Sequence, residues 1–377
     1  MTNKSAAIIG GGFSGCSYAY FLVKNGWDVT IIEKSNLIGG GVKTFFHGGH
    51  PFTYGPRHFI APESSMPAFE FLEKVIPMRH IKKINYSYQE PDDVFTTYPL
   101  HQDDIDKLSC SSQIFEELKL LEASGETEAR NFEEFWMGRV GKTLYERYNK
   151  FYNKKAWFLD DNRKMDFGFE ATVKRKPLET GSRYEFHTGW INAYPIAHDG
   201  YNKYFGWSTE GTTKLINTEV KKIDFDKKQI TLSNGELLKT DMIISTTSPD
   251  LLFDYDLGEL QYVGREVHKI VLPIEQVLPD DVYFIYYPGP KETQTRVTEF
   301  KKFTNHKSPN SLITLEVPSL KNKLYPTLLK SQVELAEKYI KRLPEYVHSV
   351  GRMGKYRYVD IDDILLDAIQ FEKDYLK

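Results

Sequence analysis

The feature that most constrains this chain is a glycine-rich turn between two short apolar stretches. Residues 6–9 are apolar, and Gly-Gly-Gly-Phe-Ser-Gly follows directly at residues 10–15. A helical pattern then runs to Gly26, and a second apolar stretch at residues 29–32 ends on Glu33. This order predicts a strand, a tight turn, a helix and a parallel strand that ends in an acid. Residues 6–33 are therefore predicted to form a βαβ unit of the Rossmann type.

The turn has the spacing of a dinucleotide-binding site. Gly10 permits the tight turn, Gly12 lets the backbone approach a pyrophosphate, and Gly15 lets helix and strand pack closely. The start of the helix offers free N–H groups and a partial positive charge to the phosphates. The acid about 20 residues further on stands where ribose hydroxyls are bound. A Rossmann fold without a ligand is the alternative, and the full match disfavours it. The predicted cofactor residues here are Gly10, Gly12, Ser14, Gly15 and Glu33.

Length and composition exclude several classes of protein. A chain of 377 residues is long enough for two or three packed subdomains. Its net charge of −3 gives no overall basic field, so a nucleic-acid partner is not expected. Cys16 and Cys110 are the two cysteines, which supports neither a disulfide framework nor a cysteine-based metal site, and no metal is predicted. The absence of a long apolar run or a signal peptide leads us to expect a cytoplasmic protein that does not insert into membranes.

Periodicity along the chain predicts an α/β fold with interleaved parts. Helices are expected at 66–75, 111–123, 132–140 and 144–151, with a loop carrying short strands at 84–102. Residues 219–225, 229–232 and 236–239 look like strands, with Asn234-Gly235 as a hairpin turn, and 242–246 is expected to return to the first sheet. More strands at 261–316 suggest a second, mixed sheet, and helices are expected at 332–342 and 362–375.

These elements divide the chain into a Rossmann-type dinucleotide-binding domain, a helical insertion that serves as substrate domain, and a mixed β-sheet domain. The expected limits are 1–65, 205–250 and 318–377 for the first, 66–165 for the second, and 166–204 with 251–317 for the third.

Residues after Glu33 favour FAD over NAD as the dinucleotide. The stretch Glu-Lys-Ser-Asn-Leu-Ile-Gly-Gly-Gly at 33–41 resembles the E-K-x-x-x-x-G-G pattern of the large FAD-binding superfamily that includes the amine oxidases. The glycines would let the backbone pass close to the flavin side of the cofactor. Val220 matches the position where this superfamily lays its backbone against the adenine. The resemblance adds Lys34, Gly40, Gly41 and Val220 to the predicted cofactor residues.

Four further stretches resemble the UDP-galactopyranose mutase family, over nearly the whole chain. They are Tyr-Gly-Pro-Arg-His-Phe at 54–59, Leu-Tyr at 144–145 with Tyr-Asn-Lys-Lys-Ala-Trp at 152–157, Thr-Arg-Val-Thr-Glu at 295–299 with Phe303, and Gly-Arg-Met-Gly-Lys-Tyr-Arg-Tyr-Val-Asp at 351–360. The last stretch is the most specific match.

The resemblance implies a substrate site. Tyr152 matches the residue that stacks on uracil, with Asn153 beside it where the family has threonine, and Trp157 matches a residue near the substrate phosphates. Arg296 matches one of two arginines that grip the pyrophosphate. The other falls on Arg183, and the alignment that gives it also matches Tyr194 to a mobile-loop tyrosine. A tyrosine on the substrate phosphate matches Tyr358. The implied catalytic residues, which hold the departing nucleotide, are Arg183, Arg296 and Tyr358.

The same resemblance places Arg352 and Asp360 at cofactor positions, with the helix after Asp360 directed at the isoalloxazine ring. Arg57 stands where the family has a flavin-loop histidine, and His58 follows one place later, so either could face the flavin. Val317 stands where the family has a phosphate-contacting tyrosine. These departures cluster at the substrate and leave the sugar and the base open.

The implied activity is an isomerisation that depends on reduced FAD. In the family's reaction the flavin N5 attacks the anomeric carbon and displaces UDP, and the ring then recloses on another hydroxyl without net redox change. UDP-galactose or a close relative is the implied substrate, polysaccharide biosynthesis through galactofuranose the implied role, and a homodimer is suggested by the resemblance alone. The alternatives are an FAD-dependent oxidoreductase of the amine-oxidase superfamily and a flavoprotein that binds a sugar nucleotide without converting it.

Overall fold

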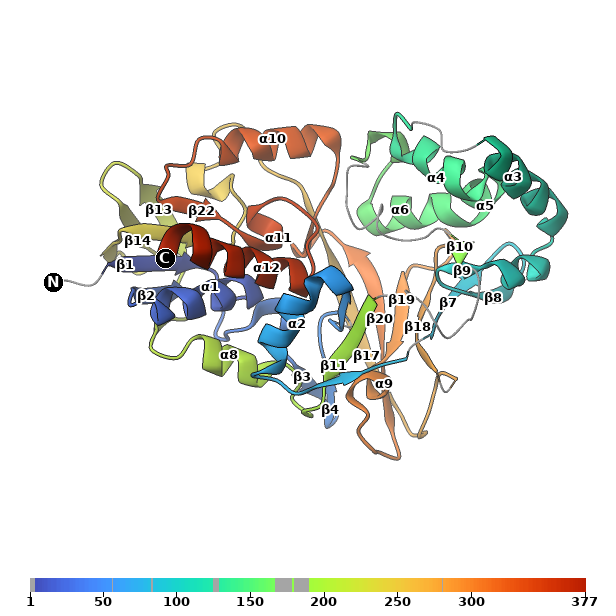
Figure 1. The fold of residues 1–377 in the computed structure, drawn as a ribbon, viewed down its shortest axis with the longest axis horizontal. Coiled ribbons are helices and arrows are strands. Elements are labelled where there is room, and N and C mark those ends of the chain that lie inside the picture. Colours follow the sequence, from blue (N-terminus) through green and yellow to red (C-terminus); the bar gives the residue numbers. More distant parts are fainter. Residues whose placement is uncertain are drawn as a thin grey trace.

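The computed structural model describes residues 4–55, 57–82, 84–124, 129–166, 178–179, 190–279 and 281–377. These residues form a Rossmann-type α/β domain, a larger mixed sheet and a group of helices, with the mixed sheet between the other two parts (Figure 1). This is the predicted fold class. Within the described ranges, no helix is both long enough and apolar enough to cross a membrane.

A parallel sheet of five strands forms the centre of the Rossmann-type domain in the described part of the chain. Strands buried on both faces need continuous apolar sequence, and the buried residues 6–9, 31–32 and 242–244 of this sheet are accordingly isoleucine, alanine and methionine. In spatial order the strands are β12 (Thr213–Leu215), β2 (Asp28–Ile32), β1 (Ser5–Ile9), β16 (Met242–Ser245) and β22 (Val347–Ser349). The predicted βαβ unit is confirmed, with β1, α1 (Phe13–Lys24) and β2 in the expected order.

Each face of this sheet is covered by a different layer. Helices α1 and α12 (Ile361–Phe371) pack side by side on one face, where Phe21 and Leu22 meet Ala368 and Phe371 (Figure 1). A small antiparallel sheet lies on the other face, and Gly235 takes a positive φ of 87° in the predicted Asn-Gly hairpin. Its strands are β13 (Val220–Asp224), β14 (Gln229–Leu232) and β15 (Leu237–Lys239).

The mixed sheet has seven strands among the described residues. Its pairs are antiparallel except for β18 with β7, which run parallel. In spatial order it contains β21 (Tyr325–Pro326), β17 (Tyr262–Leu272), β20 (Ser311–Ser319), β19 (Arg296–Glu299), β18 (Val282–Tyr286), β7 (Ile84–Gln89) and β8 (Val94–Thr97). The stretch 84–102, expected as a loop with short strands, thus extends this sheet from within the predicted helical insertion.

The helical group contains α3 (Ser111–Ser124), α4 (Phe132–Val140), α5 (Lys142–Leu144) and α6 (Lys150–Trp157). The helix predicted at 144–151 has other limits, because one π-helical turn, Tyr145–Asn149, separates α5 from α6. α6 then ends where Phe158 adopts a left-handed conformation with φ 53°. Tyr152 and Trp157 therefore belong to a single short helix.

Smaller elements connect these parts. The strands are β3 (Phe45–His47), β4 (His50–Phe52), β5 (Phe59–Pro62), β6 (Met78–His80), β9 (Leu100–His101), β10 (Leu178–Glu179) and β11 (Trp190–Pro195). The helices are α2 (Met66–Glu73), α8 (Asn202–Ser208), α9 (Phe300–Thr304), α10 (Lys330–Ile340) and α11 (Gly351–Gly354). The expected domain limits stay a prediction.

Candidate functional site

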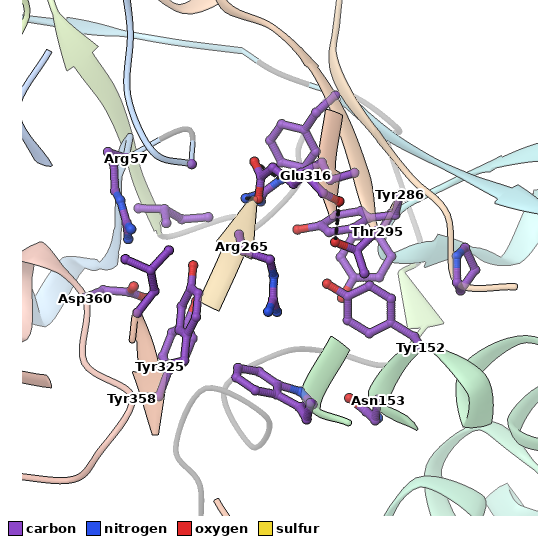
Figure 2. Close-up of a pocket in the computed structure, with 18 of the residues that line it drawn as sticks. Arg57, Tyr152, Asn153, Arg265, Tyr286, Thr295, Glu316, Tyr325, Tyr358 and Asp360 are labelled. Atoms are coloured by element: carbon purple, nitrogen blue, oxygen red, sulfur yellow. Dashed lines mark hydrogen bonds and ion pairs between the residues drawn. The ribbon is translucent and has the colours of Figure 1, made fainter. Parts of the chain in front are cut away.

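A cavity of about 470 Å³ lies where the three parts of the structure meet. Its wall combines the glycine turn after β1, the start of α12, strands β17 to β19 of the mixed sheet, and helices α4 and α6. Figure 2 shows Arg57 and Asp360 on one side, Tyr152 and Asn153 on the other, and Arg265 between them. Charged groups thus lie between a dinucleotide-type turn and an aromatic end.

The glycine turn fits the pyrophosphate of a dinucleotide. Gly12 is the N-cap of α1, and it makes no side-chain capping bond, so the first N–H groups of the helix remain available to an anion. A Cβ on Gly12 would meet no protein atom within 4 Å, which leaves open space at this point. A Cβ on Gly15, by contrast, would overlap the carbonyl oxygen of Gly10. Gly12 therefore leaves room for a ligand, whereas Gly15 allows α1 to pack closely on the turn.

Glu33 holds the turn from the end of β2. One carboxylate oxygen accepts a hydrogen bond of 2.7 Å from the Gly11 N–H, and the other accepts one of 2.8 Å from the Ser35 N–H. Its backbone carbonyl accepts from Thr218, two residues before Val220. The turn is thereby fixed next to the segment predicted to meet the adenine, although these contacts do not test a bound nucleotide. Outside the cavity lining lie Gly10, Gly15, Glu33, Lys34, Gly40 and Val220, whereas Gly12, Ser14 and Gly41 belong to it.

Arg57 and His58 both line the cavity but point to different neighbours. Arg57 has a left-handed backbone, with φ 47°, and its Nε donates to the carbonyl of Gly41 at 3.3 Å. The His58 ring stacks on Phe303, with centroids 5.5 Å apart and planes at 26°. Arg57 is therefore the one of the pair that lies against the glycine loop at 39–41.

The start of α12 forms the wall beside Arg57. Asp360 caps the helix, and its backbone N–H donates to the Asp363 carboxylate at 2.9 Å in a reciprocal capping box. Arg352 donates to the carbonyl of Val359 at 2.8 and 3.1 Å and lies 3.4 Å from the Asp360 carboxylate. The positive end of the α12 dipole is thus fixed at the cavity, where it would favour a developing negative charge.

Asp362, in the first turn of α12, is a buried acid with a perturbed pKa. Its side chain accepts a 2.7 Å hydrogen bond from the Ser65 hydroxyl, and the residue is 4% exposed. Burial, together with the nearby Asp363, raises the pKa of Asp362 from 3.8 to about 6. The folded protein therefore holds a proton between pH 4 and 6 that the unfolded chain has lost.

We expect an Asp362→Asn variant to be more stable than the wild type above pH 6. The raised pKa makes wild-type stability fall as pH rises from 4 to 6, whereas an amide does not titrate and still accepts from Ser65. The difference should reach about 2–3 kcal/mol at pH 7.5 and vanish near pH 4. Urea unfolding at the two pH values measures it, and parallel stability curves for both proteins would contradict the prediction.

Helix α6 contributes the aromatic end of the cavity. The Tyr152 ring meets Tyr286 edge-on, with centroids 5.8 Å apart, and Trp157 meets Tyr325 in the same manner at 5.5 Å. Burial raises the pKa of Tyr152, so its phenol stays neutral and offers a stacking surface. Asn153 lies beside it, within reach of the same space (Figure 2). Tyr152, Asn153 and Trp157 thus lie together in the cavity wall, while the contacts of Tyr152 and Asn153 with a base and of Trp157 with the phosphates stay predictions.

Arg296 is held in the cavity by a buried ion pair. Its Nε and Nη2 donate to the two carboxylate oxygens of Glu316, at 2.9 and 2.6 Å, and the two side chains are 16% and 4% exposed. Burial alone would lower the pKa of Arg296, but the Glu316 carboxylate outweighs it and raises the pKa. A bidentate pair fixes the plane of the guanidinium. Its Nη1 makes no hydrogen bond within the described residues and can serve an anion.

Arg265 and Tyr325 line the cavity but were not among the residues predicted from the sequence. Arg265 on β17 lies with its guanidinium 5.5 Å from the Trp157 ring and 5.2 Å from the Tyr325 ring. Tyr325 stacks on Tyr358, with centroids 5.5 Å apart and planes at 14°. Burial alone would raise the pKa of Tyr325, yet Arg57, Arg352 and Arg265 together hold it below its usual value. An arginine at a buried position of a strand, and a Tyr-Pro pair after a basic run, are the weak signals that could have indicated them.

The structure corrects the placement of Tyr194. This residue was matched to a mobile loop at the substrate, but it lies in β11, is 0% exposed and packs against Phe303 and Tyr201. A side chain without exposed surface cannot contact a substrate in this conformation. Val317 pairs with Glu266 in the mixed sheet outside the cavity lining, and the phenol of Tyr325 lies in the cavity instead. Arg183 lies outside the described residues.

Comparisons with known proteins agree with this geometry. The profile of the UDP-galactopyranose mutase family matches residues 147–358, and that of an NAD(P)-binding Rossmann-like domain matches residues 8–75. A probable UDP-galactopyranose mutase of Klebsiella pneumoniae is 23% identical over 100% of this chain and 96% of its own length. The dTDP-fucopyranose mutase of Escherichia coli is 27% identical over 98% of both chains.

The fold agrees as well. A crystal structure of reduced UDP-galactopyranose mutase superposes with a TM-score of 0.81 at 20% identity, covering 100% of this chain and 96% of that one. Since the family profile spans more than half of the sequence, the chain belongs to the UDP-galactopyranose mutase family of isomerases.

Proposed function

We propose that this protein interconverts the pyranose and furanose forms of a nucleotide-linked sugar, UDP-galactose or a close relative, with reduced FAD as cofactor. The observation that carries the proposal is the order of groups along the cavity. The ring of Tyr152 lies at one end, the guanidinium of Arg265 lies between, and Asp360 at the start of α12 lies at the other end (Figure 2). Arg296, paired with Glu316, and the glycine turn also line this cavity. Base, pyrophosphate and sugar would fit this order, with the sugar nearest the cofactor.

The arginines supply the charge that a sugar nucleotide needs. A pyrophosphate brings two negative charges, and Arg265 and Arg296 can neutralise and orient it. The Tyr325 ring lies 5.2 Å from the Arg265 guanidinium and stacks on Tyr358, so the hydroxyls of these two tyrosines are proposed to donate further hydrogen bonds. The same groups would retain the nucleotide while the sugar is detached, and Arg183 is proposed to join them. A compact, mostly apolar amine site would have no use for this charge.

The acidic side chains that line the cavity already lie against arginines. Among the described lining residues these are Glu316 and Asp360, which lie against Arg296 and Arg352. Neither is placed as a free general base. Reduced FAD, when bound, supplies the nucleophilic nitrogen and returns unchanged in oxidation state. The protein's own part is to orient the sugar, exclude water and hold the nucleotide, with Arg57 and the α12 dipole favouring negative charge at the cofactor.

The substrates for which related mutases are named limit the candidates for the sugar and the base of this protein's substrate. The mutases of Klebsiella pneumoniae and Escherichia coli are named for UDP-galactopyranose and for dTDP-fucopyranose, which differ in both the sugar and the base. We propose UDP-galactose first and a deoxygenated or dTDP-linked sugar second. A role in polysaccharide biosynthesis through galactofuranose, a cytoplasmic location and a homodimer belong to the same proposal and rest on the family resemblance.

The test is conversion of UDP-galactofuranose by the purified FAD-bound protein, followed by anion-exchange chromatography with and without dithionite. We expect UDP-galactopyranose to accumulate in the reduced sample only. dTDP-fucofuranose is run in parallel to decide between the two substrates. Failure of both with reduced FAD demonstrably bound would overturn the proposal, and oxygen or dye reduction by an amine would favour an oxidoreductase instead.

A further inference from the structure

Lys155 is a half-buried lysine of α6 that has no part in the proposed reaction. Its ammonium nitrogen donates to four backbone carbonyls, those of Tyr287 at 2.5 Å, Gly289 at 2.6 Å, Glu292 at 2.9 Å and Gln294 at 3.1 Å. All four belong to the segment 287–294, which we call the β18–β19 loop because it joins those two strands. One side chain of the helical group therefore organises an entire loop of the mixed sheet.

Residues that line the cavity flank this loop on both sides. Tyr286 ends β18 and meets Tyr152 edge-on at 5.8 Å, while Arg296 begins β19 and forms the bidentate pair with Glu316. On α6, Lys155 is three residues beyond Tyr152, so the two side chains project from the same side of the helix. Lys155 thus links the helix that bears the stacking ring to the loop that precedes the phosphate-binding arginine.

The contacts need a positive charge in this place. Four carbonyl oxygens that converge on one point repel each other unless a cation lies between them. An ammonium has three N–H donors on a tetrahedral nitrogen, so the four carbonyls share three hydrogens, and this compact charge suits such a cluster better than the planar fork of arginine. Burial lowers the pKa of Lys155 to about 8, while Glu292 and Glu90 act in the opposite direction. The lysine is therefore expected to carry its charge at neutral pH.

We propose that Lys155 is a positioning residue that sets the separation between the base-stacking ring of Tyr152 and the phosphate-binding guanidinium of Arg296. The inference rests on the proposed function, since it assigns those two groups to the base and the pyrophosphate. Without the ammonium, the β18–β19 loop loses its hydrogen bonds to α6, and the distance between Tyr152 and Arg296 is no longer fixed. The site near the cofactor does not depend on this contact.

A Lys155→Met variant tests the inference, because methionine keeps much of the volume and removes the charge. UDP and dTDP are first titrated calorimetrically into the FAD-bound wild type. The nucleotide that binds is then titrated into each variant. We expect binding to weaken at least tenfold and KM to rise in parallel, with kcat within threefold and FAD content unchanged. Lys155→Arg should recover part of the affinity, and Lys150→Met on the same helix should behave as wild type.

The remaining outcomes separate a failure of the proposed function from a failure of the positioning inference. If the wild type binds neither nucleotide, the proposed function fails. If the wild type binds and Lys155→Met binds equally well, or loses kcat as much as affinity, the positioning inference is overturned. Should the variant not fold, hydrogen exchange on the wild type replaces it: the nucleotide is expected to protect residues 287–296 together with 150–157, and protection of 150–157 alone would overturn the inference.

Discussion

A Gly12→Val variant should fold normally and fail to retain FAD. The backbone of Gly12 has φ −76°, which any residue can adopt, and a Cβ there meets no protein atom within 4 Å. That open space lies at the uncapped start of α1, where the pyrophosphate is expected to bind. Side-chain atoms in it would exclude the phosphates and weaken FAD binding by roughly a hundredfold or more, equivalent to about 3 kcal/mol.

Gly15→Val is the matched control, because it places the same side chain three residues away. Its Cβ would overlap the carbonyl of Gly10, so α1 could not pack on β1 and the fold itself should suffer. Flavin absorbance after gel filtration and thermal unfolding of the apoprotein separate the two effects. Full FAD occupancy in Gly12→Val, or equal thermal loss in both variants, would show that the turn does not serve a pyrophosphate.

Replacing Arg296 with methionine should lower kcat/KM by a factor of roughly a hundred to a thousand and also destabilise the fold. The guanidinium would be lost from the pyrophosphate, and Glu316 would keep a charge in a site where it is 4% exposed. Removing one partner of a buried pair costs about 3–5 kcal/mol, chiefly because the other charge is stranded. Steady-state kinetics and urea unfolding measure the two consequences.

The double variant Arg296→Met with Glu316→Gln distinguishes catalysis from folding. A neutral amide removes the stranded charge, so stability should return to near the wild-type value. Activity should stay low, because no cation replaces the guanidinium at the phosphate. Recovery of activity together with stability would mean that Arg296 only balances Glu316 and does not bind the substrate.

The elements predicted well from the sequence are those whose signals are local. The βαβ unit around Gly10 to Glu33 carries its turn, helix and strand signals within 30 residues, and the Asn234-Gly235 hairpin does so within ten. The π-helical turn at Tyr145–Asn149 has no such signature. It interrupts an otherwise helical pattern, and that is why the helix was predicted to end at 151 instead of 157.

Site residues that belong to a sequence motif could be predicted. Residues that reach the cavity only through the pairing of distant strands could not. Arg265 reaches the cavity because β17 pairs with β21 and β20, which brings a lone arginine beside Tyr325. No spacing rule connects two residues 60 positions apart on paired strands. Tyr194 shows the opposite error, since a residue-by-residue alignment assigned it a contact that its burial in β11 forbids.

The strand order of the parallel sheet has a consequence for how the protein is made. β1 and β2 leave the ribosome early, but their neighbours β12 and β16 follow roughly two hundred residues later, and β22, which pairs with β16, follows roughly one hundred residues after that. Until Val347–Ser349 emerges, the buried strand β16 has no partner on its outer side, and the apolar strands lack their cover from α12. Truncated or stalled chains should therefore be substrates for chaperones and proteases, and the cofactor should be captured only near the end of synthesis.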